Sequence, residues 1–135
     1  MLRNILATLV GFFVAGIVVF IFETLIGQSL FPLPENANPM DMEWLKANIS
    51  TIPLGAKLFV VFGHFMGPIA GMYIAGLISK TSLIPAYIVG AIMILATFYN
   101  IFALPKELWF RLADGLFVIA GFFIGKLLAQ RNVFN

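Results

Sequence analysis

The 135-residue chain is 61% hydrophobic and only 10% charged, and its mean hydropathy is +1.03. This composition excludes an ordinary soluble domain and is typical of a polytopic membrane protein. The net charge of +2 comes mostly from residues that flank apolar stretches, so it indicates membrane orientation and no nucleic-acid partner, while the absence of cysteine excludes disulfides, thiolate metal sites and a cysteine nucleophile.

Apolar stretches long enough to cross a bilayer occupy about residues 5–30, 54–78, 83–103 and 106–129. The first ends before Pro32, and it is too long for a signal peptide, so we expect a retained helix. The link 79–82 is so short that the helices it joins form an antiparallel hairpin. Pro105 opens the last helix, and a polar tail follows it. We therefore predict an all-α integral membrane protein, a single domain over residues 1–135 built as a four-transmembrane-helix bundle.

A proline-rich connection joins the first two spans and carries a short helical pattern. Asn38 is a favourable N-cap residue, and Pro39 suits the first helical position. Glu43 then falls near the positive end of the helix dipole. Trp44 is the kind of residue that sits at lipid headgroup level. The sequence predicts a short interfacial amphipathic helix over about residues 39–48, lying on the membrane surface.

Basic residues near the ends of the spans set the predicted orientation. Four lie on the side of both termini and four on the opposite, outer side: Arg3, Lys80, Lys126 and Arg131 against Lys46, Lys57, Lys106 and Arg111. Two of the outer ones, Lys57 and Arg111, sit within helices rather than in loops. We therefore predict an integral protein of the bacterial inner membrane with both termini cytoplasmic.

Polar side chains within the apolar stretches indicate a site. Glu23 and His64 lie roughly 6 and 10 Å inside the outer ends of their helices, at about 1.5 Å per residue. An ionisable side chain at such depth costs at least about 2.5 kcal/mol unless it is paired, so both are expected to face the bundle interior. The sequence predicts one polar cluster in the outer half of the membrane: Glu23, His64, Asn100, Arg111 and Asp114.

Glycines recur at helical spacing on the same faces as these polar residues. Small residues four or seven positions apart allow two helix backbones to approach closely. We expect this glycine-zipper pattern to act in helix packing. The predicted packing residues are Gly16, Gly63, Gly67, Gly71, Gly121 and Gly125.

Simpler interpretations exist for several cluster residues. Arg111 is four residues after Glu107 and three before Asp114, so the three side chains can pair along one helix. Asn100 can cap the end of its helix. Glu23, His64 and Asp114 are acceptable ligands for zinc, but no known ligand spacing is present. We therefore predict no metal and no cofactor.

Three functions of different classes are compatible with these residues. In the first, the protein is a transport-type homo-oligomer in which Glu23 and His64 relay protons or bind a cation. In the second, it is a non-catalytic accessory subunit that packs against a membrane-protein partner in the lipid bilayer. In the third, it is an intramembrane enzyme that uses Glu23, His64 and Asp114. No nucleophile or phosphate-binding motif supports the third, so we predict a protein that is not an enzyme.

Overall fold

The structure is a computed structural model that describes residues 1–134, so Asn135, the last residue of the predicted tail, lies outside it. Its long helices are α1 (Leu2–Phe20), which continues through the π-helix η1 (Ile21–Gly27) and α2 (Gln28–Leu30), then α4 (Leu54–Ser79), α5 (Ile84–Ala103) and α6 (Leu108–Phe134). The four long helical segments are long and apolar enough to cross a membrane. The all-helical prediction with four candidate spans is confirmed.

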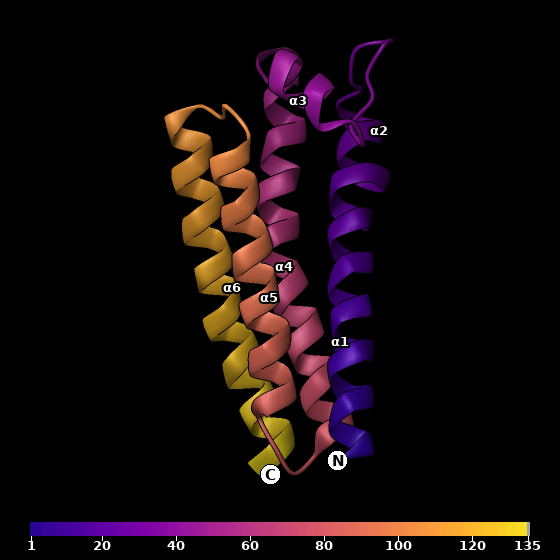
Figure 1. The fold of residues 1–135 in the computed structure, drawn as a ribbon, viewed down its shortest axis with the longest axis vertical. Helices are drawn as coiled ribbons and strands as arrows, with labels where there is room; N and C mark the ends of the chain where they lie inside the picture. Colours follow the sequence, from indigo (N-terminus) through magenta and orange to yellow (C-terminus); the bar gives the residue numbers. More distant parts are fainter. Residues whose placement is uncertain (135) are drawn as a thin grey trace.

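The four segments form one elongated bundle with both termini at the same end (Figure 1). Helix α4 contacts each of the other long helices and packs most extensively against α1 and α6. We call the end that holds the termini the terminal end. The opposite end, which carries residues 31–53 and 104–107, is the loop end. Because α4 is the central helix, its polar residues are the best placed to meet side chains from the other helices.

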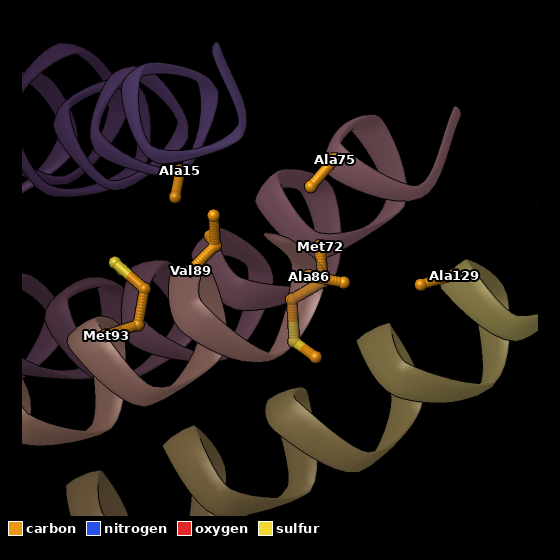
Figure 2. Close-up of a cluster of buried hydrophobic side chains, with 7 residues drawn as sticks. All are labelled: Ala15, Met72, Ala75, Ala86, Val89, Met93 and Ala129. Atoms are coloured by element: carbon orange, nitrogen blue, oxygen red, sulfur yellow. The ribbon is translucent and has the colours of Figure 1, made fainter. Parts of the chain in front are cut away.

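A buried apolar cluster ties the four helices together (Figure 2). Its members are Ala15 of α1, Met72 and Ala75 of α4, Ala86, Val89 and Met93 of α5, and Ala129 of α6. Most are small, so the helices lie close to one another, and the two methionines fill the irregular space between them. This part of the bundle is therefore closed by packed apolar side chains.

The backbones of α1 and α4 approach one another closely at two glycines. A Cβ atom on Gly71 would lie 2.6 Å from the carbonyl oxygen of Gly11, and one on Gly11 would lie 2.7 Å from that of Gly71. Neither position has room for a side chain. The buried residues of α1 are Ala7, Gly11 and Ala15, which are spaced by four. Gly11, which the sequence analysis did not select, is thus the packing glycine of α1.

Gly16 does not take part in this contact, which corrects the expectation for it. It is exposed, and a Cβ atom there would meet no atom within 4 Å. Gly16 follows Ala15 by one residue, so it is turned about 100° away from the buried stripe of α1. Within the chain, it contributes nothing to helix packing.

The other predicted packing glycines all face a neighbouring helix. Gly63 and Gly67 of α4 face Val19 of α1. Gly121 of α6 lies against the carbonyl oxygen of Phe65, and Gly125 lies against that of Pro68, where an added Cβ would be 2.9 Å away. The last pair brings α6 against the buried proline inside α4.

The short helix of the first connection starts later than predicted. Helix α3 spans Met42–Asn48, and the 3-10 helix η2 (Ile49–Thr51) follows it. Asp41 is the N-cap, since its side chain accepts a hydrogen bond of 3.0 Å from the Glu43 N–H. Asn38 instead opens a turn, because its carbonyl accepts from the Asp41 N–H. An Asn-Pro pair suits the first two positions of a β-turn as well as a helix start. The placement of α3 on a membrane surface stays a prediction.

The last span also differs from its predicted bounds. Residues 104–107 form a loop, and α6 begins at Leu108 rather than directly after Pro105. The predicted polar tail is helical as far as Phe134. In this added stretch, the Asn132 side chain donates a hydrogen bond of 3.3 Å to the Tyr73 carbonyl of α4. The late start matters most, because it leaves Lys106 free to turn into the bundle.

Candidate functional site

His64 lies at the centre of a chain of ionisable side chains from three helical elements. It is buried in α4, with its Nδ1 2.5 Å from Asp114 Oδ1 of α6. Its Nε2 is 3.0 Å from Glu23 Oε1 of η1. Each ring nitrogen therefore faces a carboxylate oxygen at hydrogen-bond distance. When both carboxylates are ionised, both nitrogens must donate, which requires the imidazolium form of the ring.

Asp114 holds a second cation on its other oxygen. Lys106 Nζ lies 2.9 Å from Asp114 Oδ2, and the same ammonium sits 4.4 Å from the centre of the Phe110 ring. The Asp114 side chain is fully buried, and that of Lys106 is 3% exposed. A buried carboxylate with two charge-assisted hydrogen bonds is a well-satisfied group. Asp114 therefore fixes the position of His64 and anchors the loop that carries Lys106.

A second ion pair closes the same region toward the loop end. Lys57 of α4 donates to Glu107 Oε1 at 2.5 Å, and the lysine side chain is almost completely buried. This hydrogen bond from a cation lowers the pKa of the Glu107 carboxyl below its ordinary value. The other oxygen, Glu107 Oε2, is buried without a hydrogen-bond partner among the described residues. The pair joins α4 to the start of α6 directly beside the His64 chain.

These groups line a cavity of about 220 Å³ at the loop end. Its polar wall is formed by Glu23, Gln28, Lys57, His64, Asn100 and Lys106. The apolar wall comes largely from the 31–53 connection, which includes Leu45 of α3 and Ile49 of η2. The connection predicted to lie on the membrane surface thus covers a polar chamber between the helices.

The π-helix η1 sets the position of Glu23. The Gln28 N–H donates to the Glu23 carbonyl, five residues back, so this turn is wider than an α-helical one. Glu23 remains 28% exposed while it contacts His64. Helix segments of this type occur often at functional sites. The π-helix was not predictable from the sequence, because hydrophobic periodicity does not distinguish it from a regular turn.

The structure brings together Glu23, His64 and Asp114 of the predicted cluster, and it places Asn100 on the cavity wall. Arg111 is exposed and outside the cluster, which corrects the prediction for it. Glu107 pairs with Lys57, and Asp114 pairs with His64 and Lys106. Both carboxylates that Arg111 was expected to reach along its helix are therefore already bound.

Lys57 and Lys106 belong to the site, although sequence reasoning treated them as flanking residues that set orientation. A count of the charges at the outer ends of the helices indicates that both lysines are needed in the site. Glu23, Glu107 and Asp114 lie near the outer ends of their helices and require cationic partners in an apolar chain. His64 alone cannot neutralise three carboxylates, and the two lysines at the same end supply the remaining charge.

Among the described residues, no group of three or more His, Asp or Glu side chains is placed to hold a metal ion. His64 lies between Glu23 and Asp114, so its nitrogens point in different directions, each toward one carboxylate. Metal ligands must instead converge on one point. The arrangement is suited to holding and passing a proton.

Comparisons with protein-family models, with curated proteins and with solved structures found no match to this chain.

Proposed function

We propose that the protein is a small transport-type membrane protein in which Glu23 and His64 take up and release a proton beside the loop-end cavity. The observation that supports this most directly is the position of His64. Its imidazole lies on the cavity wall together with Glu23, and its other ring nitrogen contacts the buried Asp114. Asp114 fixes one ring nitrogen, so the proton on Nε2 is shared with Glu23. Histidine is well suited to such exchange.

The asymmetry of the bundle supports a role in transport rather than a purely structural one. Ionisable side chains and the cavity lie at the loop end, whereas the cluster around Met72 and Val89 is dry. The cavity lies at the loop end, and the core is closed toward the terminal end. This arrangement fits one state of an alternating-access cycle. In the second state, the small-residue contacts between α1 and α4 separate, and the site opens to the terminal end.

We also propose an oligomeric state and a location for the protein. Four helices around a cavity of about 220 Å³ enclose little space, so we propose that the working unit is a homo-oligomer. We place it in the bacterial inner membrane with both termini cytoplasmic. The site then opens to the outer side, where a proton gradient supplies protons to Glu23.

Proton flux into liposomes tests this function. Purified protein is reconstituted in vesicles that contain a pH-sensitive dye, and a potassium diffusion potential, negative inside, drives protons inward. We expect lumenal acidification with the natural protein. Glu23→Gln and His64→Ala should reduce it to the rate of protein-free vesicles, because each removes one member of the proton-sharing pair.

Glu35→Gln is the matched control, since Glu35 is an exposed carboxylate in the connection at the same end of the bundle. It should leave the flux unchanged. Size-exclusion chromatography in detergent establishes that each variant remains folded and monodisperse. Equal flux from the natural protein and both site variants would overturn the proposed function.

A further inference from the structure

The charged side chains of the cavity differ in how accessible they are. Side-chain exposure is 28% for Glu23, 9% for His64, 5% for Lys57 and 3% for Lys106. Both lysines are also held by carboxylates, Lys57 by Glu107 and Lys106 by Asp114. The charge that a ligand meets in the cavity is therefore the carboxylate of Glu23. A cation is favoured there, and an anion is not.

The fixed charges around the cavity leave a deficit of one positive charge. The facing groups are Glu23 of η1, Lys57 and His64 of α4, Asp114 of α6, and Lys106 and Glu107 of the loop before α6. These are three carboxylates and two ammonium groups, so the net charge is −1 when His64 is neutral. A proton on His64 makes the site neutral. A monovalent cation beside Glu23 neutralises it equally well.

The walls of the cavity indicate the kind of cation. A bare inorganic cation needs about six oxygen ligands. The side chains of Glu23, Gln28 and Asn100 offer fewer oxygens, one of which already faces His64, and much of the remaining wall is apolar, including Leu45 and Ile49. The volume of about 220 Å³ is below the range of roughly 300 Å³ and above for drug-sized ligands. A small cation with an apolar body matches both the size and the walls.

We propose that the cavity binds a small organic monocation of the alkylammonium class, whose positive charge on Glu23 replaces the proton held by His64. This names the substrate class of the proposed transport site and rests on that function. The only covalent change is the transfer of one proton from a His64 N–H to water. The ammonium group contacts the Glu23 carboxylate, the His64 imidazolium loses one proton to water, and the net charge of the site stays at zero. Cation and proton therefore exclude one another.

Calorimetry on the purified protein in a neutral detergent tests the exchange. The probe is tetramethylammonium chloride, which has no proton to lose, so any proton released comes from the protein. Titrations in buffers of different ionisation enthalpy give the number of protons released. We expect one cation bound per chain, release of up to one proton, and an affinity that rises with pH by up to about tenfold per unit. Sodium chloride and tert-butanol, a neutral molecule of similar shape, should give no binding.

Four variants assign the roles. Glu23→Gln should weaken binding at least about tenfold, because it removes the accessible charge. Glu23→Asp should retain binding, which distinguishes loss of charge from misfolding, and Glu35→Gln should match the natural protein. His64→Gln should bind the probe without releasing a proton and without dependence on pH.

Absence of tetramethylammonium binding, binding that Glu23→Gln does not weaken, or proton release that persists in His64→Gln would each overturn the inference. The measurement is at equilibrium and needs no transport. A protein that binds the cation but moves no protons in vesicles would refute the proposed function alone. A protein that moves protons but does not bind the cation would refute only the present inference.

Discussion

Asp114 holds two cationic side chains at once, and its environment explains why the polar chain is stable in an apolar bundle. Its oxygens bind His64 and Lys106, and no part of its side chain reaches solvent. Removing one partner from such a buried group leaves the other charges uncompensated, which costs far more than the pair itself contributes. The stability of the loop end therefore depends on the whole chain of contacts rather than on any single ion pair.

A double-mutant cycle tests this dependence. Asp114→Asn should lower the free energy of unfolding by about 3–5 kcal/mol, because it leaves Lys106 without its counter-charge. Lys106→Met should be similarly costly alone, and the double variant should lose clearly less than the sum of the two. Denaturant titration in detergent measures all three. Arg111→Met, on the exposed side, should change stability by no more than about 0.5 kcal/mol. Additive losses for Asp114 and Lys106 would show that the two residues are not coupled.

The residues of this chain were predictable to different degrees. Glu23, His64 and Asp114 stand out because each is an ionisable residue within an apolar helix. Lys106 was missed because a lysine near the end of a span usually faces the headgroups, and only the loop at 104–107 turns it inward. Arg111 was wrongly included because pairing along one helix depends on whether more distant partners compete for the same carboxylates, which helical spacing does not reveal.

At the level of elements, α1 and α4 make one of the close backbone contacts of the bundle. The backbones meet at Gly11 and Gly71, and neither position has space for a Cβ atom. Sequence spacing identified the glycines of α4 but chose Gly16 rather than Gly11 on α1. Gly16 lies seven residues before Glu23, a spacing that places both on one face of an unbroken α-helix, whereas the π-helix η1 changes the helical phase between them. The missed π-helix therefore explains the error in the packing face of α1.

Alanine substitutions at two glycines of this bundle distinguish the effect of helix packing on stability from the effect of helix propensity. Gly71→Ala should destabilise the protein by about 1–3 kcal/mol, because the new methyl group meets the carbonyl oxygen of Gly11 on a facing backbone. Gly16→Ala makes the same chemical change in open space, so it should be neutral or stabilise by up to about 1 kcal/mol through helix propensity. Thermal unfolding in one detergent compares the two. Equal effects would mean that the close contact does not limit stability.

On the scale of the whole molecule, the apolar runs alone were sufficient to predict four helices and a shared end for the termini. The path of the connection over the cavity was not predictable, because Leu45 and Ile49 line the cavity together with residues of helices distant in sequence. The starts of α3 and α6 shifted for two different reasons. At α3, Asp41 is as favourable an N-cap residue as Asn38 and takes that position. At α6, Lys106 contacts Asp114, which local propensity does not specify.

The side of the membrane that the cavity faces can be measured directly. The chain has no cysteine, so a single introduced thiol is the only one present. Glu35→Cys at the loop end should react with a membrane-impermeant maleimide on intact bacterial cells after outer-membrane permeabilisation, whereas Arg131→Cys at the terminal end should react only after lysis. The reverse pattern would place the cavity on the cytoplasmic side. Labelling of both variants before lysis would indicate insertion in two orientations.

The wide turn at Ile21–Gly27 has a mechanical consequence. If its backbone returned to ordinary i to i−4 hydrogen bonding, the extra residue of the wide turn would become part of the regular helix. Glu23 would then rotate about 100° around the helix axis relative to one flanking segment. Such a twist would remove the carboxylate from the imidazole. In the proposed transport cycle, separation of Glu23 from His64 and opening of the apolar core would then be two separate events.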